Sequence, residues 1–141
     1  MMSNFWRNWL TVWCWAVALF GLVLAAGGFA ATSAPAALAM SLLHSGPAPV
    51  FDEPLRFAVG LMGALTLGLA MLVAAAMRGA DALGEGAGPV WSAITNALLV
   101  WYVVDSSISC ANGFVLNAVS NTGIIVMFLV PMLASGVLKK A

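Results

Sequence analysis

The stretch LRFAVGLMGALTLGLAMLVAAAM, residues 55–77, is apolar along almost its whole length and contains one charged residue, Arg56. About 20 apolar residues are enough for an α-helix to cross the hydrocarbon core of a bilayer. The complete sequence of 141 residues is 63% hydrophobic and 7% charged, whereas soluble domains carry about 25% charged residues. We therefore expect an integral membrane protein.

Three further apolar segments have a similar length. Together they predict an all-α membrane protein with four transmembrane helices packed as a bundle in a single domain, residues 1–141. The expected spans are about 9–30, 55–77, 90–110 and 114–138. Early in the first span, Trp6, Trp9 and Trp13 share one helical face. We expect them to anchor the helix at the membrane interface and to pack against a neighbouring helix.

A short helix is expected between the first two spans, at about residues 34–44. Ser33 and Pro35 are typical of a helix start, and Gly46 followed by Pro47 is typical of a helix end. The segment is too short to span a bilayer and has one apolar side. It is therefore predicted to lie along the membrane interface.

Small residues recur in the second span at Gly60, Ala64 and Gly68. A spacing of four residues between small side chains is typical of helices that approach another helix closely. We therefore predict that these three residues form a helix-packing contact. The glycine-rich segment that follows, residues 79–89, lacks the pattern of a phosphate-binding loop and is predicted to be a flexible linker.

The basic residues predict the orientation. In a protein with four spans, one side carries Arg7, Arg78, Lys139 and Lys140, and the other side carries only Arg56. Because cytoplasmic loops are enriched in lysine and arginine, both termini are expected in the cytoplasm. The expected location is the inner (plasma) membrane of a bacterium.

Several classes of function are disfavoured. The net charge of zero offers no basic surface for nucleic acid. Cys14 and Cys110 fall near opposite edges of the membrane in this topology, too far apart for a disulfide. His44 is the only histidine, and no spacing suits a metal site or a catalytic group. We expect no metal, no cofactor and no enzymatic activity.

One acidic residue, Asp105, lies inside an apolar span, where an ionisable group is costly and is usually functional. Trp101 and Ser109 share its helical face, and the turn Asn112–Gly113 should return the chain to the same depth. The candidate polar cluster comprises Arg56, Trp101, Asp105, Ser109, Asn117 and Asn121. Arg56 is expected to reach Asp105 from the outer end of the second span and to form an ion pair.

Three interpretations of this cluster remain open. It could be a hydrogen-bonded network that sets helix register, a site for a small polar ligand, lipid headgroup or quinone, or a relay for protons or cations. A relay needs further ionisable groups along a path. The inner halves of the spans offer only neutral polar residues, such as Thr95 and Asn96.

The layout resembles the small bacterial four-helix membrane proteins of the DoxX-like type. The resemblance rests on the short helix from Ser33 to His44, on Arg56 before a glycine-spaced span, and on Trp101–Tyr102 before Asp105. It implies a four-helix bundle, and some members are associated with quinone-linked oxidoreductase complexes. The tryptophan-rich start and the pair Asn117 and Asn121 depart from that pattern.

The sequence therefore favours a structural or accessory subunit of a membrane complex. Its expected partners are the lipid bilayer and either other membrane-protein subunits or further copies of the chain. The alternative is a protein that binds or transports a small molecule, quinone or lipid through the outer-leaflet cluster around Asp105.

Overall fold

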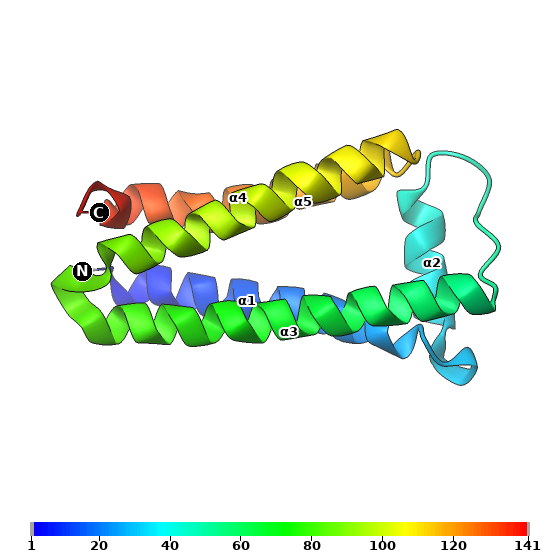
Figure 1. The fold of residues 1–141 in the computed structure, drawn as a ribbon, viewed down its shortest axis with the longest axis horizontal. Coiled ribbons are helices and arrows are strands. Elements are labelled where there is room, and N and C mark those ends of the chain that lie inside the picture. Colours follow the sequence, from blue (N-terminus) through cyan, green and yellow to red (C-terminus); the bar gives the residue numbers. More distant parts are fainter. Residues whose placement is uncertain (1, 141) are drawn as a thin grey trace.

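The computed structural model describes residues 2–140, and this range is helical throughout apart from short turns and loops. Figure 1 shows the arrangement of the elements. The α-helices are α1 (Asn4–Ala26), α2 (Ala34–Leu43), α3 (Glu53–Leu83), α4 (Gly88–Ala111) and α5 (Val115–Ser135). Short 3₁₀ turns occupy Ala30–Thr32, Gly84–Ala87 and Val137–Lys140.

Three helical segments of the described chain are long and apolar enough to cross a membrane: Asn4–Ala26, Glu53–Ala111 and Val115–Ser135. The middle segment contains both α3 and α4, which run in opposite directions on either side of the 3₁₀ turn at Gly84–Ala87 (Figure 1). These lengths and compositions support a membrane protein.

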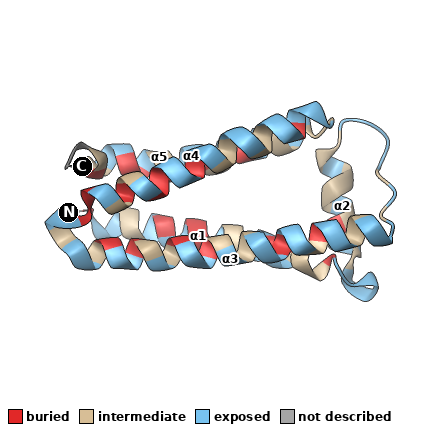
Figure 2. Ribbon diagram, in the orientation of Figure 1, coloured by how far each residue is buried: buried red, intermediate tan, exposed pale blue. Residues whose placement is uncertain are grey.

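The helices form two pairs. The pair of α1 with α3 and the pair of α4 with α5 lie one above the other in Figure 1, and α2 stands across the space between them at one end. Helix α1 begins and α5 ends at the opposite end of the molecule (Figure 1). Buried residues are most frequent in the half near the termini, where the pairs converge (Figure 2). The core there includes Leu10, Trp91, Phe128 and Met132.

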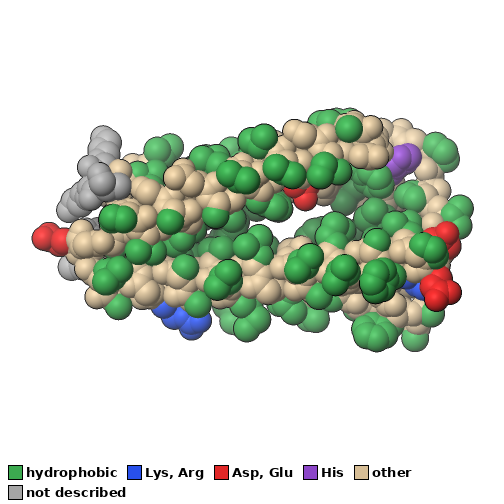
Figure 3. Space-filling model, in the orientation of Figure 1, with side chains coloured by type: hydrophobic (Ala, Val, Ile, Leu, Met, Phe, Trp, Pro, Cys, Tyr) green, Lys and Arg blue, Asp and Glu red, His purple; other side chains and the backbone are tan. Residues whose placement is uncertain are grey.

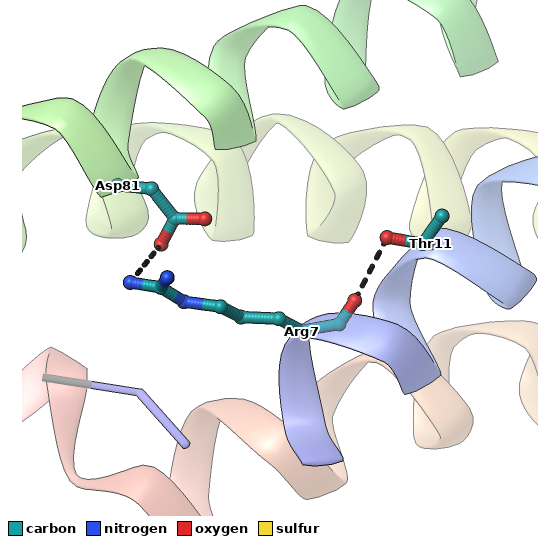
Figure 4. Close-up of polar contacts among 3 residues, drawn as sticks. All are labelled: Arg7, Thr11 and Asp81. Carbon is teal, nitrogen blue, oxygen red and sulfur yellow. Dashed lines mark hydrogen bonds and ion pairs between the residues drawn. The ribbon is translucent and has the colours of Figure 1, made fainter. Parts of the chain in front are cut away.

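Helix α3 is longer than the sequence predicted, because it continues to Leu83 and takes up the first part of the expected linker, residues 79–89. Ala80 is completely buried, and Asp81 forms a salt bridge with Arg7 of α1 at 3.1 Å (Figure 4). These two contacts help to offset the cost of Gly79, which is about 1 kcal/mol for a glycine within a helix. Gly84, with a φ of 58°, then ends the helix.

Helices α1 and α3 approach closely through glycines. A Cβ atom on Gly21 would lie 2.6 Å from the backbone nitrogen of Leu67, and one on Gly60 would lie 2.7 Å from Cα of Gly28. Gly63 lies against the backbone of Leu24 and Ala25 in the same way. At these positions only glycine lets the two backbones approach this closely.

The predicted packing stripe was therefore wrong in part. Gly60 is in the contact, but Ala64 is exposed and Gly68 has no heavy atom within 4 Å of a Cβ position. With 3.6 residues per turn, a strict four-residue spacing rotates by about 40° at each step and leaves the contact face. The spacing of Gly60, Gly63 and Leu67 stays closer to that face.

Gly63 and Gly68 form a matched pair for testing this contact. Replacing Gly63 with leucine should destabilise the fold by about 1–3 kcal/mol, because the side chain has no room beside α1. Gly68→Leu should leave stability nearly unchanged. Unfolding in mixed micelles with a denaturing detergent measures both, and equal stabilities would contradict the packing described.

The two pairs are joined near the termini by tryptophans of α1. Nε1 of Trp9 donates a hydrogen bond to the carbonyl of Met127 at 2.8 Å, and Nε1 of Trp13 donates to the carbonyl of Ile124 at 2.9 Å. Pro131 lies inside α5 and has no N–H, so the carbonyl of Met127 lacks its helical partner. The Trp9 indole supplies the missing donor.

At the other end, α2 contacts both pairs. Ala36, which is completely buried, packs with Leu24 of α1 and Val59 of α3. Immediately after α2, the backbone N–H of Ser45 donates to the carbonyl of Gly113 at 2.8 Å, in the turn between α4 and α5. Helix α2 therefore spaces the two pairs apart at this end.

Candidate functional site

Three polar side chains of α4 and α5 meet at Asp105. Its Oδ1 accepts hydrogen bonds from Nδ2 of Asn121 at 2.6 Å, from Nδ2 of Asn117 at 3.1 Å and from Oγ of Ser109 at 3.3 Å. Nδ2 of Asn117 also donates to Oγ of Ser109 at 2.8 Å. The structure therefore brings Asp105, Ser109, Asn117 and Asn121 of the candidate polar cluster into contact.

The turn between α4 and α5 explains why these residues meet. Gly113 has a φ of 80°, a conformation that glycine adopts readily, and it reverses the chain after Asn112. Asp105 lies about two turns before this reversal, so residues one to two turns after it reach the same depth. Asn117 and Asn121 are four residues apart and present both amides to α4.

The donors and acceptors of this hydrogen-bond network follow from the chemistry of Asp105. A carboxylate only accepts hydrogen bonds, so each asparagine must turn its NH₂ group, and not its carbonyl, toward Asp105. Within the described part of the chain, three oxygens of the network have no hydrogen-bond partner: Oδ2 of Asp105, Oδ1 of Asn117 and Oδ1 of Asn121. The site therefore has acceptors to offer to another molecule.

These polar residues line a cavity of about 500 Å³ between the two helix pairs. The hollow between the upper and lower layers is visible in Figure 3. Most of its wall is apolar and comes from all five α-helices. Representative lining residues are Ala16, Phe20, Met40, Leu43, Met62, Leu69, Leu98, Trp101, Phe114 and Ile124. The polar cluster forms one patch of this wall.

The ion pair expected between Arg56 and Asp105 is not formed. Nη1 of Arg56 donates to the carbonyl of Phe51 at 3.4 Å, and Arg56 does not line the cavity. The salt bridge found in the described chain joins Arg7 to Asp81 at the other end of the molecule. Arg56 belongs to the α1–α3 pair and Asp105 to the α4–α5 pair, and the cavity separates the pairs at this depth.

Trp101 does share the site. It lies one turn before Asp105 and lines the same cavity, although the structure shows no hydrogen bond from its indole within the described residues. The residues that the sequence missed are the apolar ones of the cavity wall. A leucine that faces this cavity and one that faces lipid look the same in a sequence, so no pattern could have revealed them.

The remaining reactive side chains lie apart from this cluster. Both cysteines are free; Cys14 is buried, with its Sγ 3.9 Å from Sδ of Met77, and Cys110 is exposed. Groups of three or more histidine, cysteine, aspartate or glutamate residues that could hold a metal are absent from the described chain.

Comparison with known proteins adds no relative: no family model, no curated protein and no solved structure matches this sequence. The resemblance to DoxX-like proteins remains an expectation. The function must therefore be argued from the geometry.

The network predicts a specific pattern of stability. Asn121→Leu should destabilise the protein by about 1–3 kcal/mol, because Asp105 loses its shortest hydrogen bond. The same change should cost less in an Asp105→Leu background, with a coupling of about 0.5–3 kcal/mol. Arg56→Leu is the control, and its effect should add to that of Asp105→Leu within about 0.5 kcal/mol. Coupling of Asp105 to Arg56 but not to Asn121 would overturn this account.

Proposed function

We propose that this protein crosses the membrane four times, through α1, α3, α4 and α5, and binds an amphipathic small molecule between its two helix pairs. The observation that carries the proposal is the cavity of about 500 Å³, whose wall is mostly apolar and includes the polar cluster around Asp105. Small-molecule sites usually have volumes of about 300–1,000 Å³, apolar walls and a few polar groups that orient the ligand.

The distribution of charge supports one orientation. Arg7 and Arg78 lie toward the end of the molecule where α1 begins, and Arg56 lies at the end occupied by α2. The side chains of Lys139 and Lys140, which the sequence places with Arg7, lie outside the described residues. The positive-inside rule then favours cytoplasmic termini in a bacterial inner membrane. Helix α2, with Leu38 and Leu42 exposed, would lie along the outer interface.

Reporter fusions test this topology. Alkaline phosphatase fused near Pro49, in the loop between α2 and α3, should be active because that loop is expected in the periplasm. The same reporter fused after residue 141 should be inactive, and green fluorescent protein should fluoresce there. Phosphatase activity at the C-terminal fusion would contradict the proposed orientation.

The lining of the cavity favours a ligand with an apolar body and a polar head. The body would lie among side chains such as Phe20, Leu69 and Leu98, and the head would lie beside Asp105. A lipid or a quinone has this construction. The polar patch lies in the half of the molecule near α2, so the head would be in the outer leaflet.

A purely structural role as an accessory subunit does not account for this cavity. That hypothesis remains open as the alternative, because the exposed apolar surface would suit helices of another subunit as well as lipid. The two functions differ in what accompanies the purified protein. An accessory subunit should carry other proteins in fixed proportion, and a binding protein should carry a small molecule.

Filling the cavity tests the proposal. Protein extracted directly into polymer nanodiscs should yield, on solvent extraction and mass spectrometry, an amphipathic molecule enriched over the surrounding lipid. Ala16→Phe places a ring in the cavity and should abolish the enrichment. Ala64→Phe makes the same change on an exposed residue outside the cavity and should preserve it. Identical extracts from all three proteins, together with stoichiometric partner proteins, would favour the accessory subunit.

A further inference from the structure

As a carboxylate, Asp105 gives the cavity a negative charge that no other described lining residue balances. Of its described lining residues, Asp105 alone has an ionisable side chain. Arg56 is engaged with the carbonyl of Phe51, and Arg7 is engaged with Asp81 at the far end. The Oδ1 atom of Asp105 accepts hydrogen bonds from three donors, as a carboxylate oxygen does. These donors are neutral, so they orient the carboxylate without cancelling its charge.

The free oxygens of the network all need a donor, and the indole N–H of Trp101 is a free donor of the described cluster. Oδ2 of Asp105 and the side-chain carbonyls of Asn117 and Asn121 accept hydrogen bonds and cannot donate them. An ammonium group has several N–H donors and a positive charge, and hydrogen bonds between charged groups are about twice as strong as neutral ones. A carboxylate or phosphate head would instead bring a second negative charge beside Asp105.

Aromatic side chains add a second feature that suits a cation. Trp101, one turn from Asp105, and Phe114, at the start of α5, both line the cavity. The face of an aromatic ring attracts a cation, most strongly in tryptophan and in sites that exclude water. A carboxylate together with aromatic rings in an apolar cavity is a suitable environment for an alkylammonium head.

We infer that the molecule bound in the cavity is a cationic amphiphile, an apolar chain with an amine or ammonium head, held by Asp105. This inference rests on the proposed binding function and gives it a ligand class. The head donates to Oδ2 of Asp105 and to the asparagine carbonyls, and the chain occupies the apolar wall between the helix pairs. A neutral alcohol of the same length offers one donor and no charge, so it binds more weakly.

Three photoreactive probes with the same dodecyl chain and diazirine test the inference: a primary amine, an alcohol and a carboxylic acid. They are applied to the full-length protein in phosphatidylcholine nanodiscs, and labelled residues are identified by mass spectrometry. The amine should label cavity-lining residues saturably, with a half-saturating concentration about tenfold or more below that of the alcohol. The acid should not label the cavity saturably.

Two variants separate the cavity charge from surface charge. Asp105→Asn keeps the shape of the side chain and removes its charge, and it should raise the half-saturating amine concentration to that of the alcohol. Glu53→Gln removes an exposed carboxylate at the same end of the molecule and should change nothing. If Asp105→Asn does not fold, the comparison of the three probes on the unmodified protein still decides the question.

The outcomes distinguish this inference from the proposed function. Equal saturable labelling by amine and alcohol would overturn the cationic head and leave the binding function standing. Preference for the acid would also overturn it. Absence of saturable cavity labelling by every probe would overturn both. Preference for the amine, lost in Asp105→Asn, supports both.

Discussion

The close approach of α1 and α3 through Gly21, Gly28, Gly60 and Gly63 is the constraint on which the rest of the structure depends. In a bilayer, lipid tails are as apolar as leucine, so helices gain little from hydrophobic burial against each other and rely on close packing and hydrogen bonds. Backbone-to-backbone contact makes α1 and α3 a tight unit. Helices α4 and α5 form the other unit, joined through the Asp105 network and the short turn at Gly113.

The α1–α3 pair and the α4–α5 pair pack together only where their facing surfaces are complementary. Near the termini they do, because Trp13 and Phe128 pack with ring centroids 5.5 Å apart and the tryptophan indoles bond to α5. Toward the other end, α2 stands between the pairs, packed on α1 and α3 through Ala36 and linked to the α4–α5 turn by Ser45. The cavity forms because the pairs pack together near the termini and are held apart by α2 at the other end.

How far the sequence predicts this arrangement depends on the range of each interaction. Apolar length and the turn at Asn112–Gly113 are local, so the long apolar helices and the meeting of Asp105 with Asn117 and Asn121 could be predicted. The predicted stripe of Gly60, Ala64 and Gly68 was wrong in part. Which residues of α3 form the contact depends on the position of α1, and the sequence of α3 alone does not give that position. The predicted ion pair between Arg56 and Asp105 was wrong for a different reason. Its distance from Asp105 depends on the gap between the pairs, and α2 and the packing of both pairs together set that gap.

The bond between Trp9 and the carbonyl freed by Pro131 has a consequence for assembly. In hydrocarbon, a carbonyl without a donor is unfavourable until a second helix brings one. If α5 slid by one turn along α1, the indole of Trp9 would face a carbonyl that already has its helical partner, and the Met127 carbonyl would be left alone. Pro131 of α5 therefore disfavours docking positions in which Trp9 does not reach the Met127 carbonyl. The interruption of α5 at Pro131 thus favours one register between α1 and α5.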